Sequence, residues 1–303
     1  MPNNFTWSKN DDAHYHPVNI GGPSTLPPGA YTVEIVNNQA KLIAKSIITD
    51  ELVVFPDDTV DNVLQEIDNF SKLKDNFIKY NFIYKRGVLL YGPAGSGKTT
   101  IINLLVNLIT KQGGVALFIN HPAMATIGFN MIRSVEPDRT IIAIMEDIDL
   151  MIDCYDEAGF LSLLDGENQI NNVIFVATTN NIEALKERVS NRPSRFDTVK
   201  YVGMPNDKAR EAYFKAKIPD ITAKELNEYV TLSLGYSVAH MKELIVLTKC
   251  FNIHIKDAKV RIDQAGKLVE HHVSLNKQAL DKPATLGYSV NHSNLNNVPR
   301  INS

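Results

Sequence analysis

Cysteine and tryptophan are scarce in this sequence. Its 303 residues include only two cysteines, Cys154 and Cys250, and one tryptophan. Both cysteines lie in apolar-rich segments and suggest no disulfide framework of the kind that small secreted domains need. We therefore expect the protein to work in a reducing, cytosol-like compartment and place it in the cytoplasm.

Long apolar runs and a strong charge of one sign are missing as well. No stretch reaches the ~18 apolar residues that a membrane-spanning helix needs, and the N-terminus lacks the basic-then-apolar pattern of a signal peptide. The formal net charge of −3 gives no field that would attract nucleic acid to the whole surface. We expect no membrane span, and the net charge does not indicate a nucleic-acid partner.

What remains is ordinary globular material, because 44% of the residues are hydrophobic and 21% are charged. Val88–Tyr91 is a short apolar segment, typical of a buried strand. The residues after it fit G-x-x-x-x-G-K-[ST], the phosphate-binding loop, and an apolar helical pattern follows. The sequence therefore predicts a nucleotide site made by Gly92, Pro93, Ala94, Gly95, Ser96, Gly97, Lys98, Thr99 and Thr100.

The residue types of this loop match the chemistry of a triphosphate. Glycines let successive backbone N–H groups turn towards the anion, and the N-terminus of the following helix adds a positive dipole. Lys98 would place a cation at the β- and γ-phosphates, and the Thr99 hydroxyl would bind Mg²⁺. The expected cofactors are ATP and Mg²⁺.

Other apolar segments predict further buried strands, at Val115–Ile119, Thr140–Ile144, Asn172–Ala177 and Val199–Val202. With the strand before the phosphate loop they predict an α/β fold of the P-loop NTPase type. Its parallel five-stranded sheet would be sandwiched by helices, preceded by a short β-rich segment and followed by a small all-α lid domain.

Polar residues follow two of these strands. Glu146 and Asp147 come after the third strand, and Asn180 follows the fourth. Open α/β sheets bind ligands at the carboxyl ends of their strands. One acid would hold Mg²⁺ and the other would orient the attacking water, while Asn180 would bond that water or the γ-phosphate.

Composition divides the chain further. Residues 1–28 are polar and predict a flexible N-terminal arm, and residues 29–56 predict a small β segment that is too small to bury a core alone. Residues 57–204 form the predicted nucleotide-binding domain. Residues 205–272 predict the helical lid, with a capping box at its second helix. Residues 273–303, rich in Asn and Ser, predict a disordered tail.

Three finer expectations concern local structure. Apolar residues from Val60 to Phe77 recur at helical spacing and predict one helix. Asn120–Phe129 predicts a loop that leads into a short helix at Asn130–Val135. His14 and His16 have the spacing of a metal-ligand pair, but without supporting carboxylates or cysteines we interpret them as exposed polar residues.

The order of these motifs resembles the AAA family of hexameric ATPases over about Asp58–Lys256. The resemblance rests on a Walker A motif at Gly92–Thr99, a Walker B motif at Ile141–Asp147, a sensor 1 residue at Asn180 and an arginine-finger segment at Arg192–Asp197. In motif style the sequence is most similar to the mitochondrial Rieske-protein translocase ATPases. Those proteins share the inverted Glu-Asp order, the Leu-Leu-Asp-Gly run, the Thr-Thr-Asn and the Tyr-Val-Gly that ends the fifth strand.

The resemblance implies a role for each matching residue. Glu146 would take the Mg²⁺ position, Asp147 the water-activating position and Asn180 the sensor position. Arg192 and Arg195, whose spacing alone is more typical of a solvated face, would be fingers that reach the γ-phosphate held by the next subunit. The expected protein is therefore a chaperone-like ATPase that forms a homo-oligomeric ring, expected to be a hexamer, and remodels or translocates a protein or assembly.

Departures from the family pattern keep two alternatives open. Asp147 is one methylene shorter than the usual glutamate, Ser194 stands where glycine is typical, and Met124–Phe129 lacks the basic-aromatic-glycine triplet of a threading pore. These features favour an ATP-binding switch or scaffold with little turnover. The basic pair Lys85–Arg86 is the only support for an ATPase that acts on nucleic acid.

Overall fold

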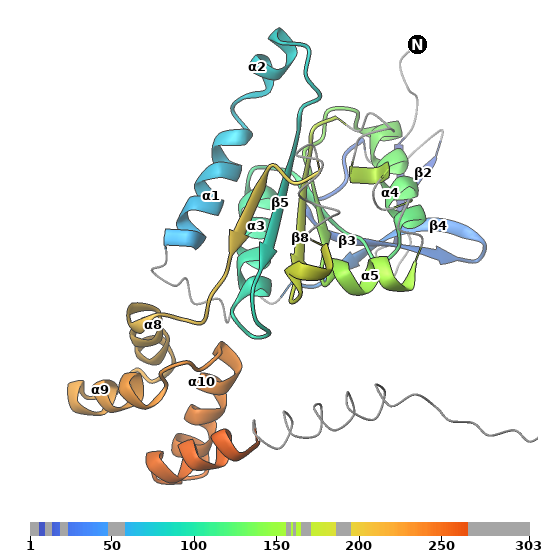
Figure 1. Ribbon diagram of the computed structural model, residues 1–303. Helices are drawn as coiled ribbons and strands as arrows, with labels where there is room; N and C mark the ends of the chain where they lie inside the picture. Colours follow the sequence, from blue (N-terminus) through green and yellow to red (C-terminus); the bar gives the residue numbers. More distant parts are fainter. Residues whose placement is uncertain are drawn as a thin grey trace, which may run out of the picture.

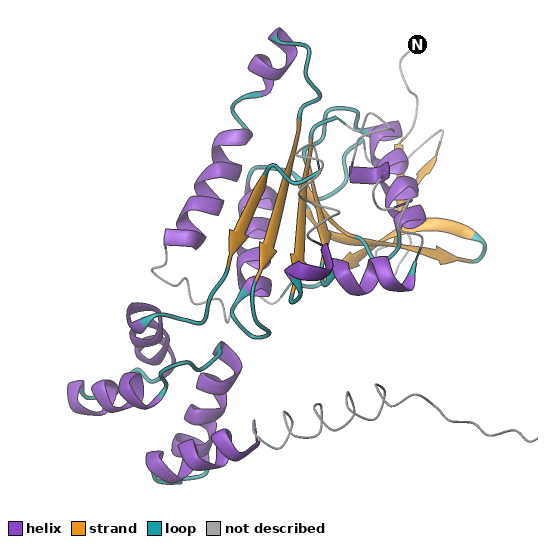
Figure 2. Ribbon diagram, viewed as in Figure 1, coloured by secondary structure: helices purple, strands orange, loops and turns teal. Residues whose placement is uncertain are grey.

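A computed structural model describes residues 6–9, 14–18, 24–47, 58–155, 159, 162–164, 171–185 and 195–265. A mixed sheet with helices on both faces is followed by a separate group of helices (Figures 1 and 2). The strands are β1 (Thr6–Lys9), β2 (His14–Val18), β3 (Gly29–Val36), β4 (Gln39–Lys45), β5 (Lys85–Tyr91), β6 (Val115–Phe118), β7 (Ile141–Met145), β8 (Val173–Thr179) and β9 (Thr198–Tyr201). The helices are α1 (Asp58–Phe70), α2 (Lys74–Lys79), α3 (Lys98–Lys111), α4 (Pro122–Val135), α5 (Ile148–Cys154), α8 (Asp207–Lys217), α9 (Ala223–Leu232), α10 (Val238–Ile245) and the π-helical η1 (Val246–Cys250).

The strands form one nine-stranded sheet in the order β1-β2-β4-β3-β6-β7-β8-β5-β9. The part from β6 to β9 is entirely parallel and contains the strands that the sequence predicts. The predicted α/β fold of the P-loop type is therefore confirmed. β3 pairs in parallel with β6 and antiparallel with β4, so the N-terminal strands continue the same sheet.

The N-terminal strands correct one expectation. β1 and β2 lie within residues 1–28, which the composition predicts as a flexible arm. The strands expected in residues 29–56 are present as β3 and β4, and they extend the central sheet. Trp7 is fully buried, and its Nε1 donates to Glu136 Oε1 over 3.0 Å. Polar composition misled the prediction because strands that add to an existing sheet need few apolar side chains of their own.

Trp7 makes this attachment testable. Removing a fully buried tryptophan leaves a cavity, and we expect Trp7→Ala to lower the free energy of unfolding by about 3–5 kcal/mol. Urea unfolding followed by circular dichroism measures the loss. Lys9→Ala, an exposed change on the same strand, is the control. Equal midpoints for the two variants would show that β1 is not packed on the domain.

Two helices differ from the sequence prediction. The helix expected from Val60 to Phe77 is interrupted after Phe70, and α2 begins only at Lys74. The expected loop before Asn130 is instead the first half of α4, so that prediction was wrong. Pro122 occupies the first turn, where proline is well tolerated, and His121 caps the helix by accepting a hydrogen bond at Nδ1 from the N–H of Ala123.

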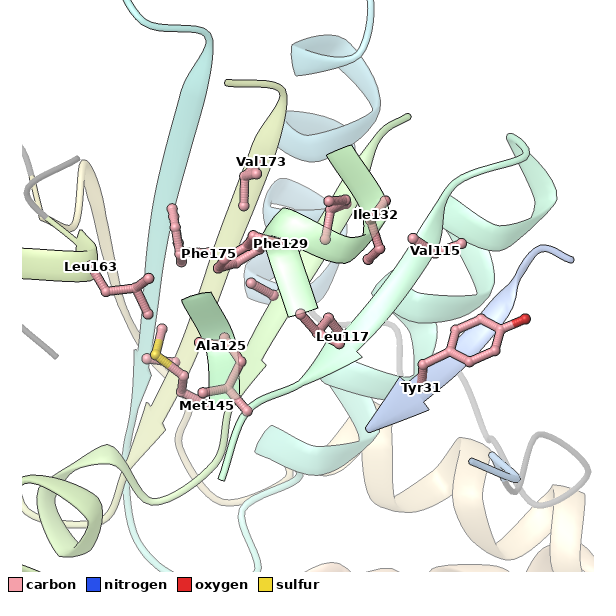
Figure 3. Packing of buried hydrophobic residues seen from close by; sticks show 14 of the residues in the cluster. Tyr31, Val115, Leu117, Ala125, Phe129, Ile132, Met145, Leu163, Val173 and Phe175 are labelled. Atoms are coloured by element: carbon pink, nitrogen blue, oxygen red, sulfur yellow. The ribbon is translucent and has the colours of Figure 1, made fainter. Parts of the chain in front are cut away.

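Apolar side chains pack on both faces of the sheet because successive strand residues point to opposite sides. On one face α1 and α3 cover the sheet, and on the other α4 and α5 do so. Figure 3 shows the second face, where Phe129 of α4 lies over Phe175 of β8, with ring centroids 6.0 Å apart. This packing holds β7 and β8 side by side and fixes where their carboxyl ends lie.

The C-terminal helices have a core of their own, which includes Phe214, Tyr229 and Met241. The capping box predicted at Thr222 and Glu225 is present in α9. A further helix spans 255–265 within the described residues. The predicted tail at residues 273–303 lies outside the described residues.

Candidate nucleotide-binding site

The phosphate loop connects the end of β5 to the start of α3, at the carboxyl edge of the parallel strands (Figure 1). Gly97 precedes α3 with φ = 107°, and Gly95 has φ = 75°. L-residues with side chains rarely adopt these values, so the motif's glycines are needed for the turn itself. The loop closes directly onto a helix N-terminus, which is the geometry that favours phosphate binding.

Lys98 is 7% exposed and lies inside the loop. Its Nζ donates to the carbonyl oxygens of Gly92 (2.7 Å) and Pro93 (2.9 Å) and to Oδ1 of Asn180 (2.8 Å). Burial lowers the pKa of the Lys98 ammonium, and the carboxylates of Asp147 and Asp149 oppose that shift. The ammonium is therefore aimed at the site by the loop and stabilised by nearby acids.

Thr99 and Glu146 meet at the mouth of the loop. The Thr99 hydroxyl donates to Glu146 Oε1 over 3.1 Å. A hydroxyl and a carboxylate this close are hard oxygen ligands of the kind that Mg²⁺ prefers, and the remaining ligands can be waters and phosphate oxygens. The two residues predicted for the metal thus lie together and fit a magnesium ion.

Asp147 and Asn180 form the other polar contact. Asn180 Nδ2 donates to Asp147 Oδ1 over 2.9 Å, while Oδ1 of the same amide accepts from Lys98. Asp147 occupies the N-cap position of α5 with φ = 49°, a left-handed conformation that aspartate tolerates better than most residues. Its backbone N–H donates to Thr178 Oγ1 over 3.0 Å. The Asn180 amide therefore bridges the loop lysine and the second acid.

A pocket of about 300 Å³ lies among these groups. It is lined by loop residues, by Glu146, Asp147, Thr178 and Asn180, and by Val238 and Ala239 at the start of α10. The Val238 N–H donates to the Gly95 carbonyl over 3.2 Å, so the lid touches the phosphate loop. Sequence reasoning did not find this lid contact, and the only available signal was the capping serine, Ser237.

A smaller cavity, about 30 Å³, lies on the other side of the loop and shares Gly97 and Thr100 with the first. Its lining is mainly apolar and includes Val60, Leu104 and Ala209. A polar pocket beside an apolar one matches a ligand with a charged tail and a flat apolar ring. The cavity is too small for a purine unless the lid moves away from the loop.

Of the two arginines predicted as fingers, the structure describes only Arg195. Arg192 lies outside the described residues, as does Ser194. Arg195 is 7% exposed, and its backbone packs against Gly87, where an added Cβ would come within 2.2 Å of the Arg195 carbonyl oxygen. The guanidinium of Arg195 is thus largely covered in the single chain, and its role as a finger stays a prediction.

The cysteines and the histidine pair singled out in the sequence lie outside the nucleotide pocket. Cys154 and Cys250 are free and exposed. His14 and His16 lie on β2, and the described part of the chain contains no group of three or more histidine, cysteine, aspartate or glutamate side chains that could hold a metal. Among the same residues, no helix is both long and apolar enough to cross a membrane.

Comparison with known proteins identifies the domain. Residues 88–204 match the family model described as "ATPase family associated with various cellular activities (AAA)". The chain contains an AAA-family ATPase domain. The matched region runs from β5 past β9 and includes every residue of the polar pocket except those contributed by the lid.

Curated relatives extend the similarity beyond the AAA domain. The vesicular-fusion protein SEC18 of Candida albicans is 28% identical over 57% of this chain and 24% of its own length. The mitochondrial chaperone BCS1 of Bos taurus is 28% identical over 50% of this chain and 39% of its own length. An "AAA ATPase forming ring-shaped complexes" from Bifidobacterium dentium is 25% identical over 77% of this chain and 55% of its own length. The chain spans about half or less of the length of these relatives.

Proposed function

We propose that this protein binds Mg-ATP in the pocket between the phosphate loop and the lid and hydrolyses it. The contact that carries the proposal is the Asn180 amide, which joins Lys98 to Asp147 beside the Thr99–Glu146 pair. Lys98 would bind the β- and γ-phosphates, and Thr99 with Glu146 would hold Mg²⁺. Bound Mg²⁺ would neutralise charge on the phosphates.

Hydrolysis needs a water aligned with the γ-phosphate. In the proposal Asp147 accepts a hydrogen bond from that water, and Asn180 fixes the carboxylate through its Nδ2–H. The same amide accepts from Lys98, so the lysine and the acid keep their spacing when a triphosphate enters. Asp147 has a left-handed backbone and lines the pocket, so its carboxylate is available to such a water.

We also propose that the chain works as a ring, expected to be a hexamer, and remodels or moves a protein or assembly. The name of the relative that forms ring-shaped complexes and the names of the chaperone and vesicular-fusion relatives support this part. Arg192 would supply the finger to the neighbouring site. Phe129 is 1% exposed in α4, so the Met124–Phe129 segment offers no large aromatic side chain for threading a polypeptide.

Steady-state ATP turnover tests the proposal directly. We expect turnover that requires Mg²⁺, stops when EDTA is added and recovers with excess Mg²⁺. The rate per chain should rise with protein concentration and then level off, because each site is completed by a neighbour. Tight ATP binding with no turnover at any concentration would favour the switch or scaffold function instead, and stimulation by DNA or RNA at low salt would favour the nucleic-acid alternative.

A further inference from the structure

A buried pair of polar side chains lies directly behind the candidate site. Thr179 is 0% exposed and Asp149 is 9% exposed. The Thr179 hydroxyl donates to Asp149 Oδ1 over 2.7 Å and accepts from the backbone N–H of Asn181 over 2.9 Å. Neither residue lines the polar pocket, and neither has a role in the catalytic scheme above.

We infer that Asp149 and Thr179 are positioning residues that fix the Asn180 amide between Lys98 and Asp147. The inference rests on the proposed ATP hydrolysis and deepens it. Thr179 precedes Asn180, and its hydroxyl holds the residue on the other side of Asn180 by the backbone. The Thr179 hydroxyl therefore stabilises the turn that carries Asn180, and this hydroxyl is itself held by the carboxylate of Asp149 on α5.

Asp149 also lies on the helix that presents Asp147 to the site. Asp149 lies in the first turn of α5, whose N-cap is Asp147, so one short helix presents both carboxylates. The backbone N–H of Asp147 donates to Thr178 Oγ1, and the side chain of Asp149 accepts from Thr179. Thr178 accepts one of these hydrogen bonds and Thr179 donates the other, so two adjacent threonines of β8 hold α5 in register with Asn180. The Gly92 N–H donates to the Thr179 carbonyl over 3.3 Å, which ties the phosphate loop to the same residue.

Burial makes this arrangement costly unless it is fully hydrogen-bonded. A carboxylate that loses its partner in a buried position pays a desolvation penalty, so an unpaired Asp149 would reorient or draw in water. Either response would shift α5 relative to β8. Errors of about 1 Å in a catalytic geometry can cost roughly a hundredfold in rate.

Three variants test the inference. Thr179→Val keeps the shape and removes the hydroxyl, and Thr179→Ser keeps the hydroxyl. We expect Thr179→Val to lower kcat by at least about tenfold, with the Kd for an ATP analogue changed by less than about threefold, and Thr179→Ser to stay near wild type. Thr110→Val removes a hydroxyl on α3, distant from Asn180, and is the control.

A double mutant separates positioning from general damage. If Thr179 acts through Asn180, Thr179→Val should cause no further loss of kcat in an Asn180→Ala background. The backbone N–H of Asn181 allows a measurement that does not depend on ATP turnover. Its hydrogen exchange should accelerate in Thr179→Val and not in Thr179→Ser. Should Thr179→Val fail to fold, Thr179→Ala serves for the same measurements, since it does not require the β-branched shape.

The outcomes also distinguish this inference from the proposed function. Additive losses in the double mutant, or unchanged kcat and Asn181 exchange in Thr179→Val, would overturn the positioning role while wild-type turnover stands. A wild-type protein without turnover would overturn the proposed hydrolysis. In that case the exchange of Asn181 still decides whether Thr179 clamps the turn, and unchanged exchange would refute the clamp.

Discussion

Asp147→Asn is expected to reduce kcat by about 10²–10⁴-fold while leaving ATP binding nearly intact. Asparagine has the same shape and can still accept the hydrogen bond from Asn180 Nδ2, so the local geometry should survive. What is lost is the negative charge that orients and polarises the attacking water. Single-turnover hydrolysis, measured beside equilibrium binding of a fluorescent ATP analogue, separates the two effects.

Matched variants sharpen this test of the inverted acid order. Asp147→Glu retains the carboxylate and should keep measurable turnover, and Asp153→Asn on the exposed side of α5 should match wild type. Glu146→Gln should raise the Mg²⁺ concentration needed for half-maximal turnover, because Glu146 contacts the Thr99 hydroxyl that we propose as a second Mg²⁺ ligand. If Asp147→Asn shifted the Mg²⁺ requirement and Glu146→Gln lowered kcat at saturating Mg²⁺, the two roles would have to be exchanged.

The parallel sheet and the arrangement of the candidate site could be predicted because short-range patterns encode them. A buried strand, the glycine loop at Gly92–Thr99 and a helix follow one another without interruption, and polar residues follow two of the later apolar strands. Carboxyl ends of parallel strands meet at one edge, so the topology alone brings Glu146, Asp147 and Asn180 together. The register of β5, β7 and β8 brings the ends of these strands, and with them Lys98, Asn180 and Asp147, close together.

Features that depend on distant partners could not be predicted. The strands around Trp7 and Tyr15 look like polar linker in the sequence, and they become strands only because the edge of the sheet and Glu136 are there to receive them. The first half of α4 contains a proline and a glycine, which favour a loop locally. Gly128 is accepted because it faces Val33 and Leu117, where an added Cβ would lie within 3 Å of both side chains.

The contact between Asp149 and Thr179 is another feature that depends on a distant partner and could not be predicted from the sequence. Thr179 stands inside the Thr-Thr-Asn run and Asp149 lies two residues after the Walker B motif, but these motifs assign a role only to the neighbouring residues. A buried threonine at a strand end has no distinctive pattern, and its partner lies 30 positions earlier in the chain. Only the three-dimensional contact shows that a carboxylate outside the pocket is committed to the Asn180 turn.

Arg192→Ala is expected to lower turnover by a factor on the order of 10³ or more, because a finger stabilises the charge of the transition state. Lys98→Ala should be equally inactive, since it removes the cation from the site itself. If the finger acts in trans, Lys98 and the Arg192 that completes the same site belong to two neighbouring subunits. Mixing the inactive proteins should therefore restore activity, because an Arg192→Ala subunit keeps Lys98 and can receive Arg192 from a Lys98→Ala neighbour.

Random mixing in equal amounts makes about one quarter of the sites complete in a head-to-tail ring, so up to about a quarter of wild-type turnover should return. Arg261→Ala, an exposed change on the lid, is the control for removing an arginine. Arg195→Ala should reduce stability as well as rate because Arg195 is buried, and urea unfolding separates this effect from catalysis. No recovery on mixing, with subunit exchange verified by labelled chains, would show that each chain completes its own site.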